Sequence, residues 1–439
     1  MTKNRIKPPK ELDLKNAIYE ERFLFEKAQV PIVTVSASYR KELADKYQAI
    51  AHTHSDIVFS RAHYSMAEAI RQQAILTKRK AVISDPINFV SKENWNKIET
   101  TEKIGKIIAR YKILKDIKDK LNSLVRQSSP VGKAIKKPLL YLTQTTRCPI
   151  ISVHYETGNI LVKNGKTVIQ CITDPHIHPQ YLESLPSPNI TFAVFDEKTK
   201  ETLLSEAKRL NKKIEDKQVV VTGAFIDPRL NKIGRRKTIF KKNEPINIAI
   251  TTGGLGTNLK EIKKILESFE KLLKTPEKIR LFLYASTHAD FRNFFEEYAK
   301  KNNIRIGNLD DEEARIRILY DDSIIDANEN LIKYMFPWAH GIIAKPSGDM
   351  AYDAAAAGCF LLFLEPWGSW EENIQKIFIK KKIGFDFNTD NAIGQFQSLL
   401  KSGKLKKAME ETSKMDSLYR DGCKNIIDLH ATMPCKKNI

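Results

Sequence analysis

Short apolar runs alternate with longer segments of helical periodicity along most of this chain. Several of the short runs are uninterrupted stretches of β-branched and aliphatic residues, as expected for strands covered on both faces. Strands that alternate with helices in this way predict parallel sheets built from βαβ units. The predicted strands form two series, the first comprising Ile32–Val35, Asp56–Phe59, Ala81–Ile83, Ile150–Val153, Val168–Ile172, Thr191–Phe195 and Val219–Val221, and the second Ile246–Thr251, Ile279–Tyr284, Ile316–Leu319, Gly341–Ala344 and Phe360–Leu364.

Two series of strands predict two sheets and therefore two domains, which suits a chain of 439 residues. The boundary is expected within Asn231–Pro245, where a Gly, a basic run and a Pro occur without sustained periodicity. The predicted organisation is an extension at 1–52, in which Ile32–Val35 could add an edge strand, a first domain at 53–235 and a second at 236–439. A C-terminal helix at about 405–430 could pack back on the first domain.

The formal net charge is +20, from 73 Lys and Arg against 53 Asp and Glu. Such an excess attracts nucleic acid, anionic membranes or phosphorylated ligands, but it also arises when lysines simply cover solvated helices. The segment 101–142 stands out, because apolar residues recur at helical spacing among eleven basic residues and only three acidic ones. A basic amphipathic helix of this kind can lie on an anionic membrane, or it can pack its apolar stripe on its own sheet.

The five cysteines are scattered and form no Cys-x-x-Cys pair. This pattern argues against a disulfide framework and a structural zinc site, and it fits a reducing cytoplasm. The N-terminus lacks the apolar core of a signal peptide, and no apolar run approaches the ~20 residues needed to span a bilayer. We therefore expect a cytoplasmic protein that is soluble or lies on a membrane face.

Three segments of the second half are candidates for a ligand site. The first, TTGGLGTN at Thr251–Asn258, joins a predicted strand to a helix with one apolar side, for which Thr257 or Asn258 is a plausible N-cap. Its glycines, Gly253, Gly254 and Gly256, would let a phosphate approach backbone N–H groups at the start of that helix. A tight strand-to-helix turn also needs Gly for its geometry alone.

The second segment, GIIAKPSGDMAYDAAAAG, is a strand followed by a Lys-Pro-Ser-Gly turn and a helix of small residues. Ser347 and Gly348 could donate hydrogen bonds to a diphosphate, and Asp353 could accept them from a ribose diol or simply face solvent. In the third segment, Glu365–Asn373, the side chains of Glu371, Glu372 and Asn373 could bind sugar hydroxyls or cap the next helix. Such loops converge at the carboxyl ends of parallel strands, where sheets of this kind bind ligands.

Taken in order, these segments resemble the donor domain of MurG-like GT-B glycosyltransferases, in particular the monogalactosyl- and glucosyl-diacylglycerol synthases. In the first half, the segments FSRAHYSMAEAI, SDPINFVS, CITDPHIHPQY and VVVTGAFIDPRL resemble the acceptor domain of the same family. The resemblance spans roughly Asp56 to Asn373. It implies an α/β protein with the GT-B fold, in which two Rossmann-like domains have parallel sheets facing across a cleft.

The resemblance also implies roles for individual residues. His63 would be the catalytic base, Asp174 would orient or assist it, and His176 and His178 would lie in an acceptor-contacting loop. In the second half, the donor UDP-sugar would be bound without a metal by Gly253, Gly254, Gly256, Thr257, Lys345, Ser347, Gly348, Asp353, Glu371, Glu372 and Asn373. A zinc site at Asp174, His176 and His178 is disfavoured because Pro175 and Pro179 make this segment a loop.

The sequence departs from the family pattern at several positions. The loop around His63 has lost its glycines, Ser347 replaces a Gly, and Asp353 replaces the Glu that binds ribose. Met350 replaces a Thr, and Ser369 stands where the family has Gln. Because Asp is one methylene shorter than Glu, the ribose contact would be weakened or moved.

The leading interpretation is a hexosyltransferase that uses a UDP-sugar and a lipid acceptor of the diacylglycerol type. It would be peripheral on the cytoplasmic membrane face, bound to anionic lipid through segment 101–142. The alternatives are a UDP-sugar epimerase or hydrolase on the same fold, and a catalytically degenerate GT-B protein that binds a nucleotide. Nucleic-acid binding is not expected, because no motif interleaves aromatic and basic residues.

Overall fold

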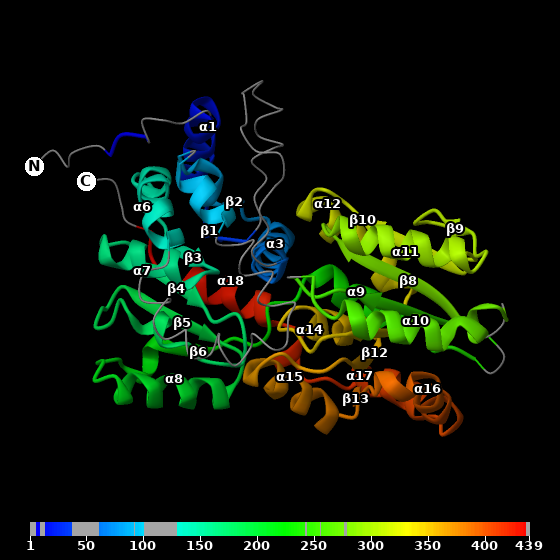
Figure 1. Ribbon diagram of the computed structural model, residues 1–439. Coiled ribbons are helices and arrows are strands. Elements are labelled where there is room, and N and C mark those ends of the chain that lie inside the picture. The colour runs from blue at the N-terminus through cyan, green and yellow to red at the C-terminus, as the bar shows by residue number, and fades with distance from the viewer. Residues whose placement is uncertain are drawn as a thin grey trace, which may run out of the picture. The chain divides into compact units, whose positions relative to one another are not determined.

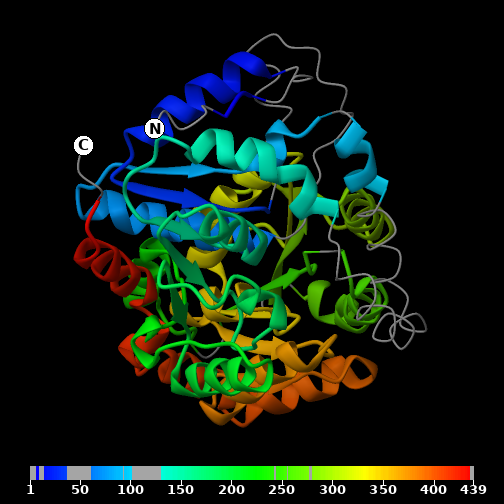
Figure 2. The ribbon, with the colours of Figure 1, turned by 90° about the vertical axis from the view of Figure 1, so that its left-hand side faces the viewer.

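The computed structural model describes residues 6–8, 14–36, 61–91, 93–100, 130–241, 244–254, 256–275 and 279–435. The chain divides into two compact units, the first comprising Met1–Asp227 and Asp421–Ile439, and the second Pro228–Arg420. Each unit contains one sheet flanked by helices (Figures 1 and 2). All described strand pairs are parallel. The prediction of an α/β protein with two parallel, Rossmann-like sheets is therefore confirmed.

Over the described residues, the sheet of the first unit has six strands in the order β2-β1-β3-β4-β5-β6. Its strands are β1 (Val30–Val33), β2 (Ala81–Ser84), β3 (Ile150–Ser152), β4 (Val168–Cys171), β5 (Ile190–Val194) and β6 (Val219–Val221). Its helices are α1 (Lys15–Glu26), α3 (Arg61–Leu76), η1 (Pro86–Phe89), α6 (Pro130–Thr143), α7 (Tyr155–Lys163), η4 (Pro179–Leu182), α8 (Glu197–Arg209), η5 (Asp216–Gln218) and α18 (Gly422–Thr432).

Strand β1 lies inside this sheet, and the prediction that it adds an edge is wrong. Ile32 aligns with Ile83 of β2 on one side and with Ile151 of β3 on the other. All four residues of β1 are buried, as their uninterrupted apolar sequence requires for a strand covered on both faces. The region interpreted as an extension, 1–52, thus contains a strand of the sheet interior. The predicted strand Asp56–Phe59 lies outside the described residues.

In the described part of the second unit, the sheet has seven strands in the order β13-β12-β11-β7-β8-β10-β9. They are β7 (Ile246–Thr251), β8 (Ile279–Ser286), β9 (Ile306–Gly307), β10 (Ile316–Tyr320), β11 (Gly341–Ala344), β12 (Phe360–Phe363) and β13 (Gly384–Asp386). The short edge strands β9 and β13 were not predicted, because neither contains an uninterrupted run of apolar residues. Both lie at the ends of the sheet.

The second unit contains the helices predicted after the Gly-rich turn, the Lys-Pro-Ser-Gly turn and the third candidate segment, and it differs from the prediction in two segments. They are α9 (Pro228–Arg236), α10 (Leu259–Leu273), α11 (Ala289–Lys301), α12 (Ile324–Asn330), the π-helical η6 (Leu331–Met335), α13 (Phe336–Trp338), α14 (Met350–Ala356), α15 (Ser369–Lys380), η7 (Thr389–Asn391), α16 (Ala392–Lys401), α17 (Lys404–Ser413) and η8 (Ser417–Tyr419). Helix α9 occupies the start of the stretch interpreted as a linker. The single helix expected at about 405–430 is instead two helices, α17 in the second unit and α18 in the first.

Helix α18 packs beside α3 within the first unit (Figures 1 and 2). The guanidinium Nη2 of Arg79 lies 3.0 Å from Nδ1 of His430, and His430 Nε2 lies 2.9 Å from the carbonyl oxygen of Pro149. Because arginine can only donate, the ring accepts at Nδ1 and donates its single proton from Nε2. The buried imidazole is therefore held in its neutral form between two partners that both suit it.

A disulfide between Cys148 and Cys435 joins the end of this C-terminal region to the residue two positions before β3. The sequence pattern argued against disulfides, and this expectation is wrong for one pair. The two cysteines are 287 residues apart, so only the packing of α18 on the first unit brings them together. The side chains of Cys171, Cys359 and Cys423 lie outside this disulfide and are buried.

Much of the basic segment 101–142 cannot be placed, since 101–129 lies outside the described residues. The remainder forms most of α6, on which Lys133, Lys136 and Lys137 are exposed. Over the described ranges, no helix is both long enough and apolar enough to cross a membrane.

The environment of His430 predicts that acid weakens the fold. Burial lowers the pKa of His430 to about 4. The charge of Arg79 lowers this pKa further, whereas the hydrogen bond to Pro149 raises it. An unfolded histidine takes up its proton near pH 6.5, so the unfolded state binds more protons between pH 6.5 and 4 and stability falls as pH falls through that window. From pH 7 to pH 5 this residue alone should remove about 2 kcal/mol from the free energy of unfolding.

Urea unfolding of wild type and His430→Gln at pH 7 and pH 5 checks this expectation. The difference in unfolding free energy between the two pH values should be smaller in the variant by about 2 kcal/mol. Equal pH dependence in the two proteins would contradict the assignment of a neutral, buried His430.

Candidate functional site

In the second unit, the strand order reverses between β7 and β11. From β7 the chain runs outward through β8 and β10 on one side, then returns to place β11 against the other side of β7. The loops that leave the carboxyl ends of β7 and β11 therefore turn in opposite directions. In open α/β sheets, ligands bind in the crevice between two loops that diverge in this way. The two loops are the Gly-rich turn at 252–258 and the Lys-Pro-Ser-Gly turn at 345–348.

At Gly253 the Gly-rich turn closely approaches Lys345. A Cβ atom at this position would lie 2.7 Å from Thr257 Oγ1 and 3.1 Å from Lys345 Cε, so no larger side chain fits without movement. Gly256 has a φ of 64°, in the left-handed region that favours glycine. Asn258 is the N-cap of the fifteen-residue helix α10 but makes no side-chain capping bond. The turn thus brings bare backbone to the start of a long helix.

A buried ion pair joins the second and third candidate segments. Lys345 Nζ lies 2.7 Å from Glu371 Oε1, and the two side chains are only 12% and 5% exposed. The other carboxylate oxygen of Glu371 accepts a hydrogen bond from the backbone N–H of Trp367 at 2.6 Å. Both oxygens of Glu371 are therefore engaged, one holding Lys345 beside Gly253 and the other fixing the loop before α15.

The neighbouring residues of α15 are placed differently. Glu372 is exposed and forms a helical ion pair with Lys376 at 3.9 Å, and Asn373 is half-buried. Of the three residues predicted to meet a sugar, Glu371 is thus part of the supporting network. Glu372 and Asn373 remain predictions.

The Lys-Pro-Ser-Gly turn is organised by its own hydroxyl. Ser347 Oγ donates to Asp349 Oδ1 at 2.7 Å and accepts a bond from the backbone N–H of Met350 at 3.3 Å. Asp353 lies in the first turn of α14 and is 7% exposed, so the alternative of a solvent-facing helix residue is wrong. A carboxylate held close to this turn suits the predicted contact with a ribose diol.

Sequence reasoning missed one residue beside the Gly-rich turn. His288 follows β8, is buried, and lies with Nε2 3.3 Å from the carbonyl oxygen of Gly254. Its place just beyond the carboxyl end of a predicted strand was the available signal, since polar residues there line the ligand edge of a parallel sheet.

The first unit has its own reversal of strand order, between β1 and β3. His63, near the start of α3, and His154, two residues after β3, meet there with ring centroids 5.1 Å apart and ring planes at 86°. His154 was not among the predicted site residues, although it stands at the carboxyl end of the predicted strand Ile150–Val153. The structure thus gives the candidate base a second imidazole as a neighbour.

The predicted acceptor loop follows β4, the next strand of this sheet. The backbone N–H of His176 donates to the carbonyl oxygen of Asp174 at 2.7 Å, and the His176 and His178 rings lie 4.8 Å apart. Within the part of the chain that is described, no group of three or more His, Cys, Asp or Glu side chains could hold a metal ion. The His176 and His178 rings therefore lie side by side in the loop that follows Asp174.

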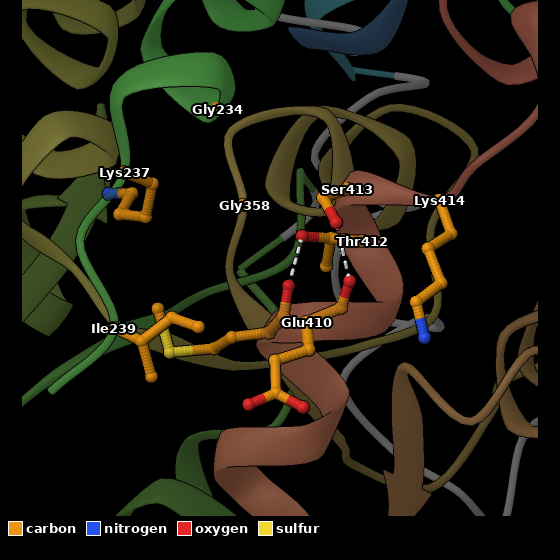
Figure 3. A pocket seen from close by; sticks show the side chains of 9 residues that line it. Gly234, Lys237, Ile239, Gly358, Glu410, Thr412, Ser413 and Lys414 are labelled. Carbon is orange, nitrogen blue, oxygen red and sulfur yellow. Dashed lines mark hydrogen bonds between the residues drawn. The ribbon is translucent and has the colours of Figure 1, made fainter.

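A pocket of about 330 Å³ lies elsewhere in the second unit (Figure 3). Gly358, which precedes β12, and the end of α17 line it, as does the aliphatic stem of Lys237. The Lys237 ammonium donates to the carbonyl oxygens of Phe336, Pro337 and Ala339, which precede β11. These contacts place the pocket at the amino ends of the strands, and none of the predicted donor residues lines it.

No family model matches this chain, and no curated protein matches it as a relative. Among solved structures, a protein assigned as a UDP-N-acetylglucosamine 2-epimerase from Listeria monocytogenes is 10% identical, with a TM-score of 0.52 over 94% of this chain and 99% of that one. MnaA from S. aureus, solved with UDP, is 12% identical, with a TM-score of 0.49 over 86% of this chain and 98% of that one. MurG from Acinetobacter baumannii is 11% identical, with a TM-score of 0.47 over 92% of this chain and 100% of that one. The Listeria protein shares the fold of this chain, and identities this low extend to nothing beyond the fold.

The ion pair predicts a contrast between two adjacent glutamates. Glu371→Ala leaves the Lys345 ammonium buried without its partner and should lower the free energy of unfolding by roughly 3–5 kcal/mol. Glu372→Ala removes only an exposed pair and should change it by less than about 0.5 kcal/mol. Urea unfolding of both variants makes the comparison, and similar small losses in the two would show that the pair does not hold the loops.

Proposed function

We propose that this protein is a UDP-sugar-dependent glycosyltransferase whose second unit binds the donor at the reversal between β7 and β11. The observation that carries the proposal is the meeting of the Gly-rich turn with the Lys345 loop at that point, with Lys345 fixed by Glu371. A glycine turn before a long helix and a positioned ammonium together offer what a nucleoside diphosphate requires. The fold shared with a UDP-sugar enzyme supports this assignment.

The proposed donor contacts follow from this geometry. The diphosphate would lie against the backbone at Gly253, Gly254, Gly256 and Thr257, where the dipole of α10 favours negative charge. Lys345 would add a positive charge, with Ser347 and Gly348 beside it. Asp353 would accept bonds from the ribose hydroxyls, and Glu372 and Asn373 would meet the sugar. Helix dipole and ammonium would offset the charge of the departing UDP, so we propose no metal.

The proposed acceptor chemistry belongs to the first unit. His63 would take the proton of the acceptor hydroxyl, because imidazole titrates close to neutral pH. Asp174 would assist, and His176 and His178 would contact the acceptor. We propose a diacylglycerol-type lipid as acceptor, reached at the cytoplasmic membrane face through segment 101–142. The exposed lysines of α6 support an attraction to anionic lipid.

A second candidate is a UDP-sugar epimerase or hydrolase. It is favoured by the assignment of the Listeria protein, which shares the fold, as a UDP-N-acetylglucosamine 2-epimerase. The two candidates differ in what they need. A transferase releases UDP only when an acceptor is present, whereas an epimerase or hydrolase converts the UDP-sugar alone. Proton NMR of the sugar, recorded with and without an acceptor, distinguishes these outcomes.

Donor binding predicts a thermal shift that depends on Asp353. UDP, UDP-glucose, UDP-galactose or UDP-N-acetylglucosamine at ~100 times its Kd should add about 2.7 kcal/mol to the free energy of unfolding and raise the melting temperature. The shift should disappear in Asp353→Ala. It should persist in Asp326→Ala, which removes an exposed acid from the first turn of α12.

No shift with any of the four ligands at millimolar concentration would contradict the donor site. A shift that survives in Asp353→Ala would instead place the nucleotide elsewhere in the protein.

A further inference from the structure

The sheet of the first unit reverses its strand order between β1 and β3. His63 is proposed as the base at this point, and no residue has yet been proposed to bind the oxygen of the acceptor hydroxyl. Open parallel sheets bind ligands at such a point, because the loops leaving the two central strands turn away from each other. His154 lies two residues after β3, and His63 lies on α3, the first described helix after β1. The two imidazoles therefore flank the point where the topology favours a ligand.

The protonation of His154 is fixed by a backbone bond. Its Nδ1 accepts the N–H of Glu156 at 3.2 Å, which makes His154 the N-cap of α7. An imidazole nitrogen that accepts a hydrogen bond carries no proton, so the neutral ring has its proton on Nε2. His154 consequently presents a donor, not an acceptor, on its other side.

The surroundings keep this ring uncharged. Burial lowers the pKa of His154 well below its usual value of 6.5, and the neighbouring His63 lowers it further because two adjacent cations repel each other. The Tyr155 ring stacks on His154 at 4.6 Å, and the Tyr181 ring meets Tyr155 edge-on at 5.7 Å. The nearest carboxylate on its own helix, Glu156, offers His154 its backbone N–H. At neutral pH the Nε2–H donor is therefore always present.

We propose that His154 is a second acceptor-binding residue, whose Nε2–H donates to the oxygen of the hydroxyl that His63 deprotonates. This inference rests on the proposed transferase function and extends it to a specific residue. A hydroxyl has one proton to give and lone pairs that accept. A fixed donor beside a base therefore orients it, with its oxygen toward His154 and its proton toward His63.

The hydroxyl proton passes to His63, the freed oxygen pair forms the new bond to the anomeric carbon of the sugar, and the bond from that carbon to the diphosphate oxygen breaks. The electron pair of the broken bond leaves with UDP. His154 exchanges no proton in this step, because its role is to hold the attacking oxygen.

The tautomer can be tested without any ligand. Long-range ¹H–¹⁵N spectra of the full-length protein with ¹⁵N-labelled histidine report which nitrogen of each ring is protonated. Comparison with His154→Phe and His63→Phe assigns the two signals. Between pH 6 and pH 8, His154 should show a protonated Nε2 and an unprotonated Nδ1. A proton on Nδ1, or a charged ring, in this range would overturn the proposal whatever the protein does with UDP-sugars.

The role in transfer is tested by pairing two variants. His154→Phe keeps an aromatic ring for the stack with Tyr155 but has no donor, and His154→Gln restores an N–H donor without the ring. UDP release is measured from UDP-glucose, UDP-galactose and UDP-N-acetylglucosamine with dioleoylglycerol in mixed micelles. His154→Phe should lower the turnover at least about tenfold, and His154→Gln should recover part of it.

The possible failures are distinguishable. Equal turnover in wild type and His154→Phe would overturn the role of His154 and leave the transferase proposal standing. No UDP release by the wild type would overturn the transferase proposal and, with it, the hydroxyl contact. The melting-temperature shift with UDP should be the same in wild type and His154→Phe, because His154 lies outside the unit that holds the donor residues, and this control excludes general loss of folding.

Discussion

The ion pair between Lys345 and Glu371 is the contact on which the candidate donor site depends. It joins the loop after β11 to the loop before α15, and it holds the lysine stem against Gly253 in the turn after β7. A buried pair of this kind contributes little net stability compared with an apolar pair, but breaking it leaves a buried charge. Its value is positional, since three loops are fixed relative to one another before any ligand arrives.

Strand order explains why these loops meet. The first strand of each sheet in chain order is β1 in the first unit and β7 in the second. In each unit the next strands are added on one side of that strand, and the chain then crosses to its other side. The loops at this point therefore diverge and place their residues at the carboxyl edge of the sheet. In the second unit this edge carries Gly253, Lys345 and Asp353. In the first it carries His63 and His154. Both candidate sites thus follow from the same rule of parallel-sheet topology.

The sequence was informative where a segment has a strong period or a motif. Uninterrupted apolar runs predicted the interior strands, and the Gly-rich turn predicted the start of α10. Contacts between distant segments were not readable, because no local pattern encodes them. This is why the Lys345–Glu371 ion pair, the place of His154 beside His63, the interior position of β1 and the Cys148–Cys435 disulfide were missed.

Hydrogen–deuterium exchange with and without UDP tests the central claim, that the β7 and β11 loops form a nucleotide site. Bound nucleotide should slow deuterium uptake in peptides covering 252–259 and 345–353, because their backbone N–H groups become ordered or directly bonded. The account would be contradicted if uptake there were unchanged while peptides covering 234–239 and 409–414, which line the pocket at the amino ends of the strands, were protected instead.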